Sequence, residues 1–233
     1  MITLMLFILA AWFLALFAGP AIYTAMGLAG FAFLLLAGVP GIVIPQKVAM
    51  AANSFPLLAA PLFILMGNLM NTSGISYRIF DFAKAVVGWM RGGLCHANIV
   101  GSLIFAGMSG SAVADAAGMG AVEIEAMKKE GYAPEVAGAV TAASATIGPI
   151  IPPSLPMIVY GVAAEASIGS LFVAGIIPGL LMTVALMVMV RHIAIRDNLP
   201  RHPFEGVRAL FTAFRRAFWA LMAPVVLFGG LLS

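Results

Sequence analysis

Two interruptions in the apolar stretch from Cys95 to Gly161 constrain the fold of this chain more than any other feature. One apolar run stops between Gly107 and Ser111, and a second is broken between Gly148 and Pro153. The pieces are shorter than the roughly 20 residues that a helix needs to cross a bilayer, and proline opens a helix because it lacks an amide donor. Backbone groups left unpaired in lipid are costly, so such breaks persist only where protein, water or an ion satisfies them. This stretch is therefore predicted to form a binding site.

The composition predicts an all-α integral membrane protein that crosses the bilayer several times. Hydrophobic residues make up 63% of the chain and charged residues 9%, and the mean hydropathy is +1.09. These values lie far outside the range of soluble domains. The net charge of +3 comes from basic residues between apolar runs, so it indicates membrane topology and no nucleic-acid partner is expected. The single cysteine, Cys95, excludes an internal disulfide and a cysteine-based metal cluster.

The apolar runs divide the chain into five segments. We expect N-terminal spans in 1–75, an amphipathic surface helix in 76–94, a re-entrant hairpin in 95–130, a broken helix in 134–165, and in 168–233 a span, a basic linker with a surface helix, and the start of a further span. Within the first segment, the spans are expected at 2–18, at 21–39 and from Leu57 to about Met70. A turn-rich connection is expected from Pro40 to Pro56.

The distribution of basic residues supports the hairpin. Lysine and arginine collect in cytoplasmic loops, and here they cluster at 78–91, 128–129 and 191–216. If all three clusters lie inside, the chain must leave and return between Arg91 and Lys128. A single segment of about 30 residues can do so only as a re-entrant hairpin, because two full crossings need more. The tip would then lie at Ser109-Gly110-Ser111.

Each break also offers groups that can bind ions. At the hairpin tip the first arm ends in free carbonyls, the second begins with free amides, and Ser109 and Ser111 add hydroxyls. The second break repeats the pattern, with hydroxyl side chains before it and freed carbonyls near Ile147. Paired discontinuous helices indicate a substrate and ion site near the bilayer midplane. The alternative is one kinked helix and one loop in a purely structural membrane subunit.

Asp115 is the only charged residue between Arg91 and Glu123. An acid within the membrane indicates function, but a carboxylate in the first turn of a helix is also stabilised by the helix dipole. Both roles, helix start and ion coordination, remain open. Glu123, Glu125 and Glu130 are expected to face water.

A second function is suggested by Gly107-Met108-Ser109-Gly110, which matches the short G-x-S-G pattern of rhomboid-type intramembrane serine proteases. A serine nucleophile needs a histidine within hydrogen-bond reach. His96 lies at the hairpin base, and His192 and His202 lie in the basic tract. None is well placed, so we expect no enzyme and keep proteolysis as the alternative.

Several segments have distinctive sequences: GSAVADAAG at 110–118, MKKEGY at 127–132, TAASATIGPIIPPS at 141–154, GIIPG at 175–179, SFPLLAAPLFIL at 54–65 and RGGL at 91–94. They closely resemble the large membrane (M) subunit of tripartite ATP-independent periplasmic (TRAP) transporters. The resemblance runs along the whole chain. Because the family subunit is nearly twice this length, the chain is expected to be its N-terminal half, one half of an inverted repeat.

The resemblance implies an elevator-type secondary transporter of the bacterial inner (cytoplasmic) membrane, with sodium as the coupling ion and no other cofactor. Its substrate would be an organic anion such as a C4-dicarboxylate, a sialic acid or a related carboxylate. A periplasmic substrate-binding protein would deliver it, and a small membrane subunit would support the scaffold. Residues 76–165 would move, whereas 1–40 and 170–233 would belong to the scaffold.

The resemblance also assigns site residues. By match with the family, the sodium-binding residues would be Ser109, Gly110, Ser111, Ala112, Ser144, Thr146, Ile147, Gly148 and Pro149. The part of the substrate site present here is expected at Ser111, Asp115, Pro152 and Ser154.

Overall fold

The protein is described by a computed structural model that covers residues 2–53 and 55–232. The chain forms two compact units, Met1–Phe55 (unit 1) and Pro56–Ser233 (unit 2). Within the described residues all regular structure is helical and there is no β-strand. The all-α prediction is therefore confirmed.

Unit 1 contains a pair of packed helices, α1 (Ile2–Phe17) and α2 (Ile22–Leu36), followed by α3 (Val43–Ala52). The paired helices have 16 and 15 residues, fewer than the roughly 20 that span a bilayer. The expectation of a turn-rich connection from Pro40 to Pro56 is wrong, since α3 occupies most of it. A helix forms there because Pro45 lies in its first turn, where an amide needs no partner.

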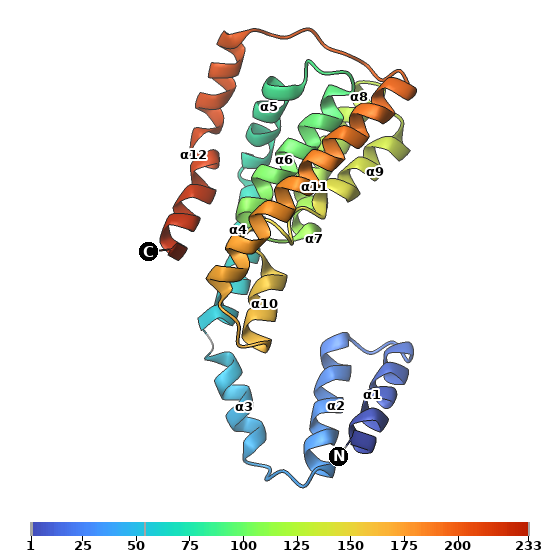
Figure 1. Ribbon diagram of the computed structural model, residues 1–233, viewed down its shortest axis with the longest axis vertical. Coiled ribbons are helices and arrows are strands. Elements are labelled where there is room, and N and C mark those ends of the chain that lie inside the picture. The colour runs from blue at the N-terminus through green and yellow to red at the C-terminus, as the bar shows by residue number, and fades with distance from the viewer. Residues whose placement is uncertain (1, 54, 233) are drawn as a thin grey trace. The chain divides into compact units, whose positions relative to one another are not determined.

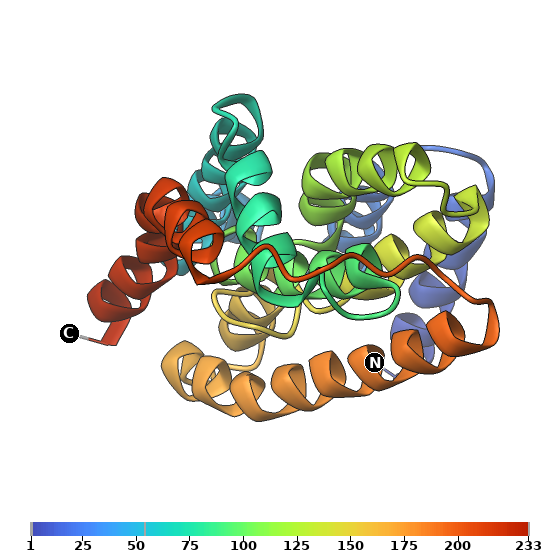
Figure 2. The same cartoon turned by 90° about the horizontal axis from the view of Figure 1, so that it is seen from above.

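Unit 2 is built around a buried central helix, α6 (Gly93–Ser109). In chain order its elements are α4 (Phe55–Thr72), α5 (Ile75–Val87), α6, α7 (Ala112–Ala114), the π-helical turn η1 (Asp115–Met119), α8 (Gly120–Lys129), α9 (Pro134–Ala145), α10 (Leu155–Ala163), α11 (Ile168–Arg196) and α12 (Val207–Leu232). Helices α5, α8, α9, α11 and α12 all contact α6. Figures 1 and 2 show this arrangement, in which α11 runs along one side of the group. The first interruption thus directly follows the most extensively buried helix among the described residues.

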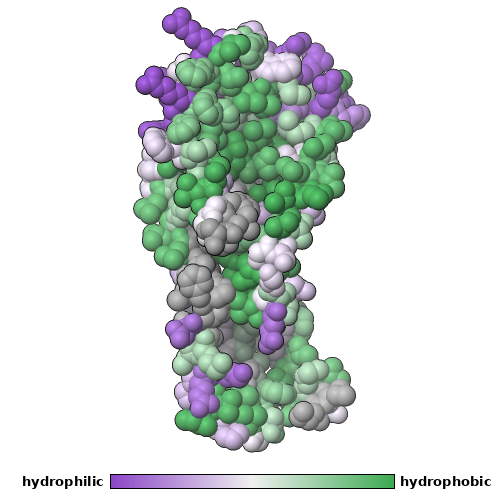
Figure 3. Space-filling model, turned by 60° about the vertical axis from the view of Figure 1, so that its left-hand side comes forward, coloured by the Kyte–Doolittle hydropathy of each residue, from purple (hydrophilic) through white to green (hydrophobic). Residues whose placement is uncertain are grey.

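The segments that carry the three basic clusters come together at one end of unit 2, where α5, α8 and α11 end and α12 begins (Figure 1). Lys84 Nζ lies 2.7 Å from Glu130 Oε1, and Arg201 Nε donates to the Trp89 carbonyl at 3.3 Å. These contacts join the three basic clusters. Hydrophilic side chains also gather at this end in Figure 3, beside a largely hydrophobic helix surface. The argument from the distribution of basic residues requires all three clusters to lie at the same end, as they do here.

Among the residues that the structure describes, two helices are long and apolar enough to cross a membrane: α11, and residues 207–227 of α12. The sequence predicts a surface helix in the basic tract and a separate span from about Phe218, but the structure has one continuous helix. That expectation is wrong because residues 207–223 contain no glycine or proline, and even Pro224 lies inside the helix. The predicted amphipathic helix exists as α5, and its buried face packs on α6 and α12.

Candidate functional site

The first interruption is a helical hairpin. Helix α6 ends at Ser109, where Gly110 takes a left-handed conformation (φ +59°) that glycine adopts without strain. Ser111 then caps α7, its Oγ accepting a hydrogen bond from Ala114 N at 3.3 Å. The second arm runs back along α6, since a Cβ on Gly101 would lie 2.9 Å from Glu123 Oε1. The chain therefore reverses direction at the predicted tip, and the re-entrant hairpin in a membrane stays a prediction.

The second interruption separates α9 from α10. Helix α9 ends at Ala145, and the Thr146 Oγ1 donates to the Ala143 carbonyl at 2.6 Å. Residues 146–154 form turns and bends rather than a helix. Ser154 then caps α10, its Oγ accepting from Met157 N at 3.2 Å. The predicted broken helix is therefore present.

The two interruptions meet in space. Leu155 N, at the start of α10, donates to the Gly110 carbonyl at 3.2 Å. A Cβ on Gly110 would collide with the Pro153 carbonyl oxygen, and a Cβ on Gly148 would lie 3.2 Å from the Ser111 carbonyl carbon. The hairpin tip and the broken helix thus pack backbone against backbone. This contact is possible because glycines occupy both sides of it.

Several oxygen atoms in the two interruptions have no hydrogen-bond partner in the described part of the chain. Ser109 Oγ is buried and has no hydrogen-bond partner among the described residues. Over the same part of the chain, no hydrogen bond reaches the carbonyls of Thr146 and Gly148. The Ile147 carbonyl, in contrast, accepts from Ile150 N and Ile151 N at 3.0 and 2.9 Å. The unpaired oxygens therefore lie on either side of Ile147 and at Ser109.

An open pocket of about 740 Å³ lies beside the tip. Its lining is mostly apolar and comprises Gly110, Ser111, Ala112, Val113, Pro149, Leu155, Pro156, Val159, Tyr160 and Ala163. Of the four residues predicted to contact substrate, Ser111 is part of this lining, whereas Asp115, Pro152 and Ser154 are buried outside it. Ser154 Oγ donates to the Pro149 carbonyl at 2.6 Å, so it holds the turn between α9 and α10.

Two carboxylates are buried behind the hairpin tip. Asp115, in the π-helical turn, is 1% exposed and Glu123 is fully buried. None of their four oxygens has a hydrogen-bond partner among the residues that the structure describes. Ser102 lies beside Asp115 but its single hydroxyl proton is donated to Ser144. A helix-capping role for Asp115 is not seen, because Ser111 caps the second arm.

The expectation that Glu123 faces water is wrong. A π-helical turn holds one residue more than an α-turn and rotates the residues that follow it. Glu123 therefore points at α6, where Gly101 leaves room for it. Glu125 is exposed as expected, and its hydrogen bond with Lys129 lowers the pKa of the Glu125 carboxyl. Glu130 is half-buried beside Lys84.

A buried polar network, missed by the sequence analysis, joins the hairpin to α9. Asn98 Nδ2 donates to Thr141 Oγ1 at 2.7 Å, and Ser144 Oγ donates to Asn98 Oδ1 at 2.6 Å. Ser102 Oγ donates to Ser144 Oγ at 3.2 Å. All four side chains are at most 3% exposed. The sequence did contain a signal for this network. Asn98 and Ser102 are polar residues spaced by four in an apolar run, and this spacing places both on one helix face.

The geometry gives no support to a serine protease. His96 Nδ1 pairs with the Gly92 carbonyl at the start of α6, about 13 residues or about 20 Å from Ser109 at 1.5 Å per residue. His202 pairs with Glu130 at the charged end. Within the described residues Ser109 Oγ therefore has no catalytic base in reach.

Comparison with known proteins gives the family. The family model described as "Tripartite ATP-independent periplasmic transporter, DctM component" matches residues 8–233. The chain belongs to this DctM family. The resemblance seen in the sequence is thereby confirmed, and the expectation that the chain is not an enzyme is confirmed because the family consists of transport components. The protease alternative is wrong.

Relatives in the DctM family are named as TRAP permeases. The chain is 50% identical over 188 residues to the "Sialic acid TRAP transporter permease protein SiaT" of Haemophilus influenzae (strain 86-028NP), covering 81% of this chain and 30% of the relative. It is 45% identical over 223 residues to the large permease protein SiaM of Vibrio cholerae, covering 95% and 52%. It is 41% identical over 180 residues to the C4-dicarboxylate large permease protein DctM of the same species, covering 77% and 40%. The chain thus spans about half or less of the length of these relatives.

Proposed function

We propose that this DctM-family chain forms part of a sodium-coupled secondary transporter of the bacterial inner membrane that imports an organic acid. Two of the relatives described above carry sialic acid in their names and one carries C4-dicarboxylate, so the substrate is proposed to be a carboxylate of this kind. A periplasmic binding protein would deliver it, and a small membrane subunit would complete the complex. The name of the family, which includes "ATP-independent periplasmic transporter", supports an ion gradient as the energy source.

The observation that carries this proposal is the junction of the two interruptions. Oxygen atoms without partners among the described residues lie in both interruptions: the Ser109 hydroxyl at the end of α6, and the carbonyls of Thr146 and Gly148 after α9. Breaks of this kind in a membrane are stable only if their backbone groups are satisfied, and freed helix-end carbonyls suit a small alkali cation. We place sodium here, among the predicted residues 109–112, 144 and 146–149.

The substrate would lie in the open pocket beside the tip, with Ser111 as its hydrogen-bonding contact. Asp115 would act from behind the tip on the sodium ion or on a proton rather than on the substrate, because it is buried outside the pocket. Residues 76–165 would move as one body against the scaffold. Gly175 and Gly179 of α11 pack closely on Ile150 and Ile151, and such small residues let helices approach and slide.

Uptake into proteoliposomes tests this function. We expect the permease containing this chain, reconstituted with its small subunit and binding protein, to accumulate sialic acid or a C4-dicarboxylate only with an inward sodium gradient. The variants Ser111→Ala and Thr146→Val should weaken the sodium dependence. Ser111→Ala also removes a helix cap worth about 1 kcal/mol, so Thr146→Val is the cleaner variant.

The matched control is Thr212→Val, which removes an exposed threonine hydroxyl bonded to its own helix. Equal uptake with sodium and without it would contradict the coupling. An unchanged sodium response in both site variants would contradict the assignment of the residues.

A further inference from the structure

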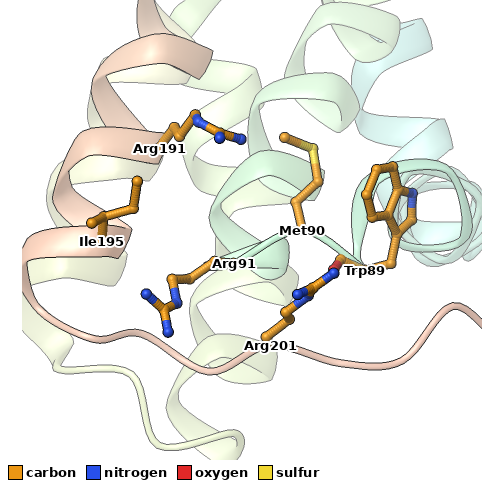
Figure 4. Close-up of a pocket in the computed structure, with 6 residues that line it drawn as sticks. All are labelled: Trp89, Met90, Arg91, Arg191, Ile195 and Arg201. Atoms are coloured by element: carbon orange, nitrogen blue, oxygen red, sulfur yellow. The ribbon is translucent and has the colours of Figure 1, made fainter.

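Three arginines without acidic partners line one cavity at the charged end of unit 2. The cavity measures about 480 Å³, and its lining includes Trp89, Met90, Arg91, Arg191, Ile195 and Arg201. In Figure 4 the three guanidinium groups come from three segments: the turn before α6, helix α11, and the coil that follows α11. The ion pairs found in the described part of the chain use other cations, namely Lys84, Lys129, Arg196 and His202.

Hydrogen bonds and close packing hold together the three segments that carry these arginines. Arg201 Nε donates to the Trp89 carbonyl at 3.3 Å, and Gly92 N donates to the Pro200 carbonyl at 2.9 Å. The turn before α6 also packs closely on α11, because a Cβ on Gly92 would lie 2.7 Å from the Ala194 Cβ. Like charges repel one another, so a cluster fixed in this way favours the binding of an anion.

The cavity lies where the apolar part of α11 ends. Residues 168–190 carry no charge and Arg191 is the first charged residue of the helix. This part of the helix is about 34 Å long at 1.5 Å per residue, and the hydrocarbon core of a bilayer is about 30 Å thick. Arg191 therefore reaches the headgroup level. Trp89, with 43% of its surface exposed, is a side chain typical of that level.

We propose that this cavity binds the phosphate group of an anionic phospholipid in the cytoplasmic leaflet. The planar guanidinium fork matches phosphate oxygens in a bidentate manner. The apolar side chains of Met90 and Ile195 offer a wall for the glycerol and the first acyl carbons. Basic pockets between membrane helices on the cytoplasmic side are suited to such headgroups. A bound lipid would bridge α11 and the turn that starts the hairpin.

Native mass spectrometry of the detergent-purified permease containing this chain tests the proposal, with phosphatidylglycerol and phosphatidylcholine as probes. Removing two arginines in R91Q/R191Q is expected to weaken phosphatidylglycerol binding about 30-fold, from the usual contribution of single basic residues to binding of anionic lipid. The single variant R191Q, which perturbs folding less, should weaken it about five-fold. Phosphatidylcholine binding should not change.

Arg196→Gln is the matched control, because Arg196 lies on the same helix but pairs with Asp197 outside the cavity. Equal phosphatidylglycerol binding by wild type and R191Q would overturn the proposal. Displacement of the lipid by millimolar inorganic phosphate would also overturn it, by identifying a soluble phosphate as the occupant. Equal binding of the two lipids would exclude recognition of the anionic headgroup.

Discussion

Replacing Gly110 by alanine is expected to reduce sodium-driven uptake strongly. Gly110 has a φ of +59°, and its Cβ would collide with the carbonyl oxygen of Pro153 in the other interruption. A left-handed backbone costs a non-glycine residue about 1–2 kcal/mol, and the collision can be relieved only by moving one backbone away from the other. We expect initial uptake to fall at least about tenfold, the rate change that corresponds to about 1.4 kcal/mol. Initial rates in proteoliposomes are the measurement.

Gly131→Ala is the matched control for this variant. Gly131 has a φ of +84°, but an added Cβ there would meet nothing within 4 Å. The control therefore carries the backbone strain without the collision. If both variants lose uptake equally, strain alone explains the loss and the contact between the interruptions has no special role.

Replacing Asn98 by leucine is expected to destabilise the fold. Asn98 bonds to the hydroxyls of Thr141 and Ser144, and all three side chains are buried. Leaving a buried polar group without its partner costs about 1–3 kcal/mol, so losing two partners should cost about 2–5 kcal/mol. The measurement is thermal unfolding in detergent, where we expect a clear fall in the midpoint.

A combined variant checks that polar pairing is the cause. Asn98→Leu with Thr141→Val, Ser144→Ala and Ser102→Ala makes all four side chains of the network apolar, and such joint replacement can be nearly neutral. The combined variant should therefore recover part of the lost stability. If it is less stable than Asn98→Leu alone, packing rather than hydrogen bonding is the main contribution of this network.

The sequence was sufficient to predict the two interruptions and the arrangement of charges. Closely spaced glycines and prolines strongly favour the end of a helix, so the breaks at Gly110 and after Ala145 could be placed. The clusters at 78–91, 128–129 and 191–216 could be assigned to one end because loop charge follows topology. Family motifs added the identity of the transporter class.

The remaining features depend on tertiary packing. The burial of Glu123 follows from the π-helical turn at Asp115–Met119, and the residue pattern did not predict this turn. The partners of Asn98 lie 43 and 46 residues away, so the network could not be predicted from the residues that neighbour Asn98 in the sequence. Helix α3 formed where prolines suggested turns, because a proline in a first helical turn costs no hydrogen bond.

The most direct test of the central claim is the sodium concentration that gives half-maximal uptake, compared between wild type and Ser109→Ala. Ser109 Oγ is buried at the end of α6, next to the hairpin tip, and has no hydrogen-bond partner among the described residues, so its removal should raise this concentration several-fold. Ser73→Ala, which removes an exposed hydroxyl bonded to its own helix, should leave it unchanged. An identical sodium response in Ser109→Ala and wild type would contradict a sodium site at the junction of the two interruptions.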